Sequence, residues 1–219
     1  MRRHQTGFTL VEIAIVLVII GLLLGGVLKG QELINSAKVK SLISDMRSTS
    51  TFVYAYQDRF RALPGDDGAA DTHVNGGTLA AAANRASGRI NGAWNSTTQT
   101  DESYLFWQHV RLAGFASGSA VVGSAEYIPR NADGGPIGIT GDPVFTAAAG
   151  WAASYYVCSA GIQGRYVRQI DITIDDGNTT TGSVRVLGTQ AGGTVASSAT
   201  FYQVLPADDA TLYTVCIAY

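Results

Sequence analysis

An apolar run of 21 residues near the N-terminus constrains this chain more than any other feature. It extends from Phe8 to Leu28 and contains one charged residue, Glu12. A helix of about 20 apolar residues is long enough to span the hydrocarbon core of a bilayer. A basic leader of seven residues with two arginines precedes the run. The run is therefore a candidate membrane span.

A cleaved signal peptide and a plain membrane anchor are two simpler explanations of this run. A signal peptide has an apolar region of about 7–15 residues followed by an A-x-A-like cleavage site. Here the run is longer, and no such site follows it. A plain anchor leaves Glu12 unexplained, because a carboxylate inside a membrane helix costs at least ~2.5–3.5 kcal/mol. Glu12 therefore indicates a partner or a function.

The residues from Gly7 to Glu12 closely resemble the processing motif of type IV pilin-like precursors, a family that includes pilins and type II secretion pseudopilins. They read Gly-Phe-Thr-Leu-Val-Glu. The resemblance implies that a prepilin peptidase cuts between Gly7 and Phe8 and then methylates the new N-terminus of Phe8. It also implies that Glu12, the fifth residue of the mature chain, and Thr9 act in assembly and register.

The charges at the mature N-terminus are consistent with this implied role. Cleavage would create a cationic amine on Phe8, and methylation would leave it charged. In a bundle of such helices, that amine and the Glu12 carboxylate of a neighbour would neutralise each other. Removing one partner of a buried ion pair typically costs ~3–5 kcal/mol, because the other charge is stranded. We therefore expect Glu12 to set the register of assembly more than the fold of the monomer.

An amphipathic pattern follows the apolar run and predicts that the helix continues. Residues 31–61 contain neither Pro nor Gly, and large apolar residues recur at near-helical spacing from Ile43 to Phe60. Pro64 and Gly65 are expected to end the helix. The chain is thus expected to comprise a cleaved leader (1–7), a transmembrane assembly helix (8–28), its amphipathic continuation (29–62) and an exported globular head (63–219).

The head is expected to combine long Gly-rich loops with a helix and a sheet. A short helical turn is predicted at Leu79–Arg85, a helix from Thr100 to Ala113, and a long surface loop over residues 117–150. His109 shares a face of that helix with Leu105 and Leu112, which indicates a packed histidine rather than a ligand. Short β-branched or aromatic segments predict strands at Ala152–Cys158, Gln169–Ile174, Ser183–Leu187, Phe201–Leu205 and Thr211–Ala218.

The alternation of isoleucines in Gln169–Ile174 predicts a strand that forms a hairpin with Ser183–Leu187. A short helix before the turn is the alternative. The order of a long helix, a loop region with a helix, and then an antiparallel sheet predicts an α+β fold. It resembles the pilin architecture, in which a long helix packs on a sheet.

Cys158 and Cys216 are the only cysteines, and both lie in predicted strands. A zinc site needs more ligands, and the mature chain offers only His73 and His109. A disulfide is the default in an exported domain, and pilins commonly carry one near the C-terminus. Closing a loop of about 59 residues would stabilise the fold by ~4 kcal/mol on the chain-entropy model. Two unpaired buried cysteines are the alternative.

Composition and motifs point away from catalysis and from nucleic-acid binding. The chain has 15 basic and 17 acidic residues, so it lacks the positive charge of a nucleic-acid binder. No motif of a serine hydrolase, zinc protease, thiol oxidoreductase or P-loop ATPase occurs. We therefore expect a non-enzymatic protein without a cofactor. Candidate calcium ligands are Asp66, Asp67 and Asp71, or Asp175 and Asp176, although aspartates that form turns are the commoner explanation.

The sequence as a whole predicts a structural subunit, a minor pilin, of a type IV pilus-like filament. Its expected partners are other pilin or pseudopilin subunits, the prepilin peptidase, which is also the N-methyltransferase, and inner-membrane lipid before assembly. The N-terminus would be cytoplasmic and the head exported. A type II secretion pseudopilin is one alternative, and an adhesin or DNA-binding module displayed on a filament is another.

Overall fold

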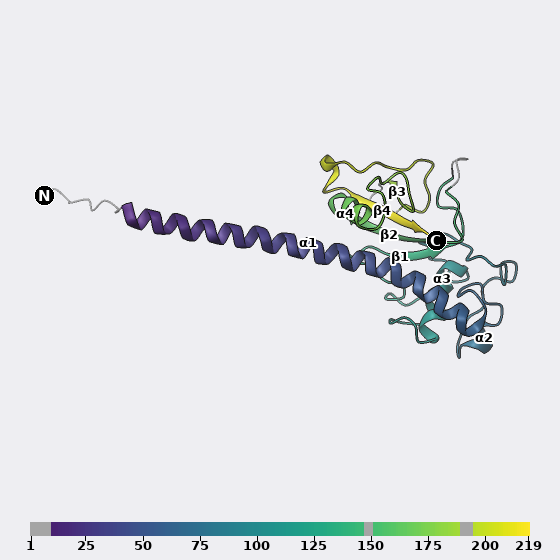
Figure 1. Cartoon of the computed structure of the whole chain (residues 1–219). Helices are drawn as coiled ribbons and strands as arrows, with labels where there is room; N and C mark the ends of the chain where they lie inside the picture. The colour runs from purple at the N-terminus through teal and green to yellow at the C-terminus, as the bar shows by residue number, and fades with distance from the viewer. Residues whose placement is uncertain (1–9, 147–150, 189–194) are drawn as a thin grey trace. The chain divides into compact units, whose positions relative to one another are not determined.

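The computed structural model describes residues 10–146, 151–188 and 195–219 (Figure 1). By its internal contacts the chain divides after Lys38 into two compact units. The helix α1 (Leu10–Phe60) belongs to both units, and all the other elements belong to the second. The further helices are α2 (Ala70–His73), α3 (Glu102–Leu112), α4 (Gly164–Ile174) and the 3₁₀ turn η2 (Pro206–Asp208).

The helix α1 runs without a break for 51 residues. It ends at Arg61, which adopts a φ of +56° and donates its backbone N–H to the Gln57 carbonyl at 2.9 Å. A residue in the left-handed region is a common helix terminator. Pro64 and Gly65 follow within four residues. The predicted continuation of the apolar run into a second, amphipathic stretch is therefore confirmed.

The second part of α1 packs on the head through one face. Its buried apolar side chains recur three or four residues apart, which places them on a single stripe of the helix. They are Val39, Leu42, Ile43, Met46, Val53 and Tyr56. Burying a side chain of this size contributes roughly 1.5–3 kcal/mol, so this stripe is a large share of the core of the head.

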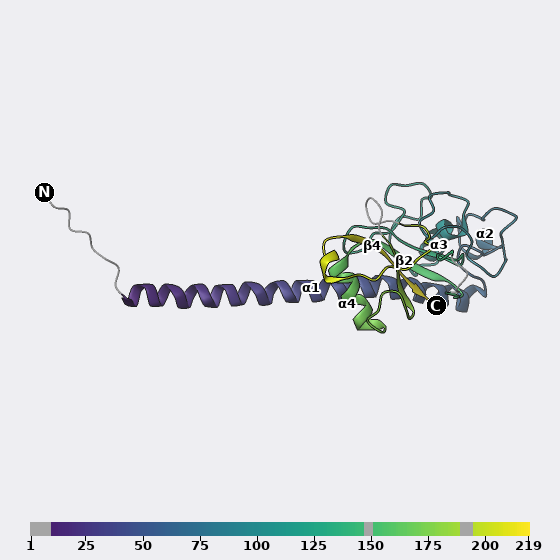
Figure 2. The same cartoon turned by 90° about the horizontal axis from the view of Figure 1, so that it is seen from above.

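Four antiparallel strands form the sheet of the head, in the order β1-β2-β4-β3. The strands are β1 (Ile137–Thr140), β2 (Tyr156–Gln163), β3 (Val184–Gly188) and β4 (Leu212–Ala218). The second part of α1 runs alongside this sheet (Figures 1 and 2). The predicted α+β class, a long helix on an antiparallel sheet, is confirmed.

Alternating side chains on the strands separate two cores. On β2, Val157 and Ile162 belong to the core that contains α1, α3 and α4. Tyr156 and Cys158, on the opposite face of β2, belong to a smaller core covered by loop residues such as Trp94. A two-residue repeat alternates the two faces of a strand, and β2, β3 and β4 each supply side chains to both cores.

The segment Gln169–Ile174 is helical, and the predicted strand and hairpin there are wrong. It forms the end of α4, which buries Tyr166, Val167 and Ile170 at helical spacing and leaves Ile172 69% exposed. The alternating isoleucines have the two-residue period of a strand, but in the helix Ile170 is buried while Ile172 faces solvent. The short helix considered as the alternative is the observed element.

Two further predictions on the head, the short helix at Leu79–Arg85 and the strand at Phe201–Leu205, need correction. Leu79–Arg85 forms turns, and the short helix of this region is α2. Phe201–Leu205 is not a strand, although the Tyr202 N–H donates to the Val186 carbonyl on β3 at 3.0 Å. The Thr179 hydroxyl accepts the Val204 N–H at 3.0 Å and donates to the Tyr202 carbonyl. A side chain therefore makes the hydrogen bonds that a neighbouring strand would otherwise make with this segment.

The strand β1 lies inside the stretch that was predicted to be a surface loop. All four of its residues are buried, and a Cβ on Gly138 would overlap the Trp94 carbonyl oxygen. The glycine that reads as a loop signal is therefore required by close backbone packing. The predicted strand Ala152–Cys158 begins later, at Tyr156, and continues through a bulge at Gly161 to Gln163. The predicted helix at 100–113 and the strands at 183–187 and 211–218 are confirmed within one or two residues.

Candidate assembly helix and sites in the head

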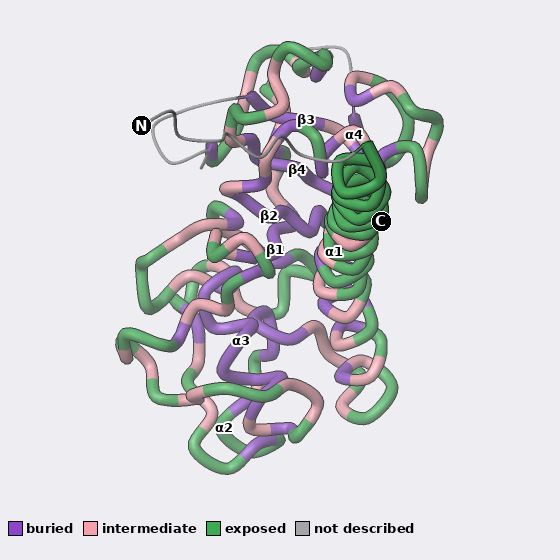
Figure 3. Tube along the Cα trace, turned by 90° about the vertical axis from the view of Figure 1, so that its left-hand side faces the viewer, coloured by how far each residue is buried: buried purple, intermediate pink, exposed green. Residues whose placement is uncertain are grey.

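The first part of α1 presents a continuous apolar surface. Every residue from Leu10 to Leu28 is exposed, and these residues are green in Figure 3. Among the described residues, α1 is the one helix long and apolar enough to cross a membrane. Exposed apolar patches of this extent mark a surface that contacts lipid or other proteins.

Glu12 lies in the first turn of α1, exposed among large apolar side chains. The N-terminus of a helix carries a partial positive charge, so a carboxylate is favoured there. Leu10, Val11 and Ile13 flank it and are each about half exposed or more. The structure thus places one acidic group at the start of an otherwise apolar helix.

Four glycines, Gly21, Gly25, Gly26 and Gly30, lie within this part of α1 and do not interrupt it. A Cβ at any of them would meet no atom within 4 Å, so packing inside the chain does not require them. Just beyond the apolar run, Lys29 Nζ pairs with Glu32 Oε2 at 2.7 Å on the exposed surface.

His109 connects the turn after α1 to α3. It is fully buried, and its Nδ1 accepts the Gly65 N–H at 2.9 Å. The Nε2 atom lies 2.8 Å from the Thr78 carbonyl, so it carries the hydrogen and donates. Burial lowers the pKa of His109, which keeps the ring neutral. The prediction of a packed histidine is confirmed.

The candidate calcium ligands after α1 already accept several hydrogen bonds. The Asp66 carboxylate accepts the N–H groups of Ser87 and Gly88, both at 2.7 Å. Asp67 accepts the Tyr56 hydroxyl at 2.8 Å and the Ala69 N–H at 2.9 Å, and its Oδ2 lies 2.7 Å from His73 Nδ1.

These hydrogen bonds also set the charge of Asp67. Burial alone would raise the pKa of Asp67, but the bonds from His73, Ala69 and Tyr56 together lower it. The third candidate, Asp71, is exposed on α2. In the part of the chain that the structure describes, these three aspartates do not form a group close enough to share a metal ion.

Cys158 and Cys216 form a disulfide, as the resemblance implies. They are register partners on the adjacent strands β2 and β4, with Cα atoms 4.1 Å apart. Both are fully buried in the smaller core, on the face of the sheet opposite α1. The bond therefore joins the last strand to the centre of the sheet.

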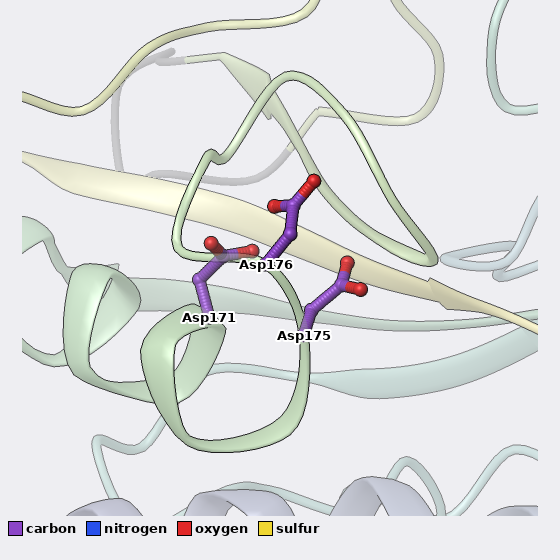
Figure 4. Close-up of side chains that lie close together, drawn as sticks. All are labelled: Asp171, Asp175 and Asp176. Carbon is purple, nitrogen blue, oxygen red and sulfur yellow. The ribbon is translucent and has the colours of Figure 1, made fainter.

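Three other aspartates gather at the end of α4. One oxygen from each of Asp171, Asp175 and Asp176 lies within 4.8 Å of the other two. Figure 4 shows the three side chains at the end of α4 and in the turn that follows it. Burial, followed by the charges of Asp175 and Asp176, raises the pKa of Asp171 to about 6, against a smaller opposing effect of the Gly177 N–H.

Asp171 did not appear among the candidates taken from the sequence, whereas Asp175 and Asp176 did. A strand over Gln169–Ile174 would place Asp171 opposite the isoleucines and facing solvent. A helix places it beside Ile170 and one turn before Asp175. The helical spacing of Tyr166, Val167 and Ile170 is the sequence pattern that predicts this helix and therefore the position of Asp171.

A comparison with protein families bears on the N-terminal part of the chain. Residues 2–28 match the prokaryotic N-terminal methylation motif. This match covers the leader, the residues around Gly7 and Phe8, and the apolar run. The N-terminal segment of the chain is thus similar to that of type IV prepilins. No curated protein and no solved structure matches it significantly.

The residues predicted to be processed precede α1 in the sequence. Gly7, Phe8 and Thr9 lie outside the described residues, and so does the leader. Glu12 lies inside them, two residues after Leu10. The motif and the apolar helix indicate a membrane-anchored, exported protein. The motif also implies processing by a prepilin peptidase and assembly with other pilins, without identifying particular partners. Proteins with this motif are typically structural.

Proposed function

We propose that this prepilin-like protein is a structural, non-catalytic subunit, a minor pilin, of a type IV pilus-like filament. Prepilin peptidase would cut between Gly7 and Phe8 and methylate Phe8. The processed chain would wait in the inner membrane with its N-terminus cytoplasmic and its head exported. It would then polymerise through the first part of α1.

The observation that carries this proposal is Glu12, the single acidic group in the exposed apolar part of α1 (residues 10–28), which lies within the segment that matches the methylation motif. A carboxylate in the hydrocarbon core of a membrane costs at least ~2.5–3.5 kcal/mol, a cost that a nearby cation in the assembled filament would offset. The cationic amine of Phe8 in a neighbouring subunit would supply that positive charge. Thr9 lies between the amine and Glu12 in the sequence, and we assign it to the same contact.

The size of the chain supports a specialised rather than a main subunit. After loss of the leader, 212 residues remain, which is long for the most abundant pilin or pseudopilin. Most of this length is head, and residues 62–219 carry thirteen acidic residues against seven arginines. We therefore propose a minor pilin with a distinct, acidic head.

Substitution of Glu12 tests the proposed route of assembly. Glu12→Ala removes the carboxylate, and at ~3–5 kcal/mol for a stranded charge we expect at least a tenfold loss of the subunit from sheared filaments. Quantitative immunoblotting of sheared filaments against the membrane fraction measures this loss. Glu32→Ala is the matched control, since Glu32 is an exposed acid on the same helix.

The expected pattern is loss of incorporation for Glu12→Ala alone, with the protein still present in membranes. Equal incorporation of the Glu12→Ala and Glu32→Ala proteins would refute the role assigned to Glu12. Deletion of the gene, scored for surface filaments and for protein secretion, distinguishes a pilus from a secretion pseudopilus. Lost secretion with intact filaments would contradict the minor-pilin proposal.

A further inference from the structure

The side chain of Asp171 is fully buried, and the Gly177 N–H, the smallest influence on its pKa, does not reach it with normal hydrogen-bond geometry. Asp171 lies in the last turn of α4 with none of its surface exposed, and neither of its oxygens has a partner in hydrogen-bond geometry. Asp67 is a useful contrast, because it is equally buried but accepts three hydrogen bonds. An uncompensated buried carboxylate costs several kcal/mol, so Asp171 calls for a partner.

The space that Asp171 faces contains two more carboxylates. One oxygen of Asp171, one of Asp175 and one of Asp176 lie within 4.8 Å of one another. Figure 4 shows that Asp171 comes from α4 and that the other two come from the turn directly after it. Three negative groups at this spacing repel one another unless a positive charge lies between them.

Hydrogen bonds from the following loop hold the two outer carboxylates in place. Asp175 accepts the Val184 N–H at 2.7 Å, at the start of β3. Asp176 accepts the Asn178 N–H at 2.9 Å and the Thr181 hydroxyl at 2.6 Å. Each carboxylate oxygen has two lone pairs, so these bonds leave acceptor capacity free. Such bonds orient metal-binding carboxylates in many proteins.

A basic side chain does not fill this role. The charge of Arg185 acts on Asp176, but its guanidinium lies over the rings of Trp151 and Phe201, 5.2 and 4.7 Å from their centroids. Its Nε donates to the Gly182 carbonyl at 3.0 Å. Within the described part of the chain, Arg185 forms no ion pair with the three aspartates at 4.0 Å or less.

The donor set fits a hard divalent cation. Ca²⁺ binds six to eight oxygen ligands at about 2.3–2.6 Å, so two oxygens on one ion can lie as much as roughly 5 Å apart. All three aspartates meet this limit through oxygen atoms. Mg²⁺ requires shorter bonds and near-octahedral geometry, which an irregular turn satisfies less readily.

We propose that Asp171, Asp175 and Asp176 bind a Ca²⁺ ion that joins the C-terminal end of α4 to the start of β3. The ion would neutralise the buried Asp171 and would fix the loop between α4 and β3. The proposal concerns the head alone and does not depend on how the subunit assembles. Its effect would be a head that is more stable in the presence of calcium.

Thermal unfolding of the full-length protein in detergent, with EDTA or with added CaCl₂, tests this site. With calcium in about a hundredfold excess over its Kd, we expect the wild-type Tm to rise by roughly 5–10 °C. The rise should disappear in Asp171→Asn and in Asp176→Asn. Asp58→Asn is the control, because it removes one exposed carboxylate on α1 and should retain the full rise.

Several outcomes would overturn the proposal. A wild-type Tm that is equal in EDTA and in calcium would mean that Asp171 is protonated rather than metal-bound. A full rise in both aspartate variants of the cluster would place the ion elsewhere, and an equal rise with MgCl₂ would contradict the assignment to calcium. If Asp171→Asn does not fold, Asp176→Asn decides, because its side chain is exposed.

Discussion

At the residue scale, one buried acidic side chain, Glu102, links the packing of the head to pH. Glu102, the first residue of α3, is fully buried, and its Oε2 accepts the backbone N–H and the side-chain amide of Asn91 at 2.7 and 2.8 Å. Burial, together with the charge of Asp66, raises the pKa of Glu102 to about 7 even though the bonds from Asn91 oppose this. Glu102 is therefore an acid that the folded state prefers to keep protonated.

The raised pKa of Glu102 predicts a specific dependence of stability on pH. Between about pH 4.5 and 7 the folded state holds a proton that the unfolded state has released, so the free energy of unfolding falls as pH rises through this range. Glu102→Gln cannot ionise and should lose this component. Measured in detergent, its Tm should therefore rise relative to wild type between pH 5 and pH 8.

An exposed acid provides the comparison for this prediction. Glu126→Gln removes the same charge at a solvent-exposed position and is the control for the change in net charge alone. A Glu102→Gln protein whose Tm follows the wild type in parallel across this range would show that Glu102 is not responsible.

The elements of the fold differ in how well the sequence predicts them. The helix α1 could be predicted because it is long and lacks Pro throughout. The helix α3 and the strands β3 and β4 also have distinct patterns and flanking turn residues. The sequence predicts α4 only as the alternative to a strand, because the exposed Ile172 continues a strand-like alternation, and it does not predict β1, because Gly138 is typical of a loop. In both cases tertiary packing overrides the local pattern.

The disulfide is the covalent link between two elements, and its removal tests their contribution to stability. Cys158→Ala combined with Cys216→Ala removes a bond between register partners on β2 and β4. We expect the free energy of unfolding to fall by about 2–5 kcal/mol, as for other disulfides of exported domains. Denaturant unfolding of the full chain in detergent measures this change.

Each single cysteine variant serves as the control, because it breaks the bond but changes one side chain only. The single variants should lose nearly as much stability as the double variant. A double variant as stable as wild type would mean that the two cores alone hold β4 in place.

At the scale of the whole molecule, the candidate sites differ in how far the sequence reveals them. The methylation motif is a short local pattern, so Gly7, Phe8 and Glu12 can be identified without any structure. The candidate calcium site depends on α4, so Asp171 becomes visible only when the fold places it beside Asp175. Local chemistry is readable from the sequence, while sites built by tertiary structure are not.

The central claim is that the chain is a prepilin-like subunit whose apolar helix is retained after processing. Intact-mass spectrometry of the protein, purified from cells with and without prepilin peptidase, tests it most directly. The account predicts loss of residues 1–7 and the addition of one methyl group on Phe8, only when the peptidase is present. An intact leader in both strains, or cleavage beyond Leu28, would contradict it.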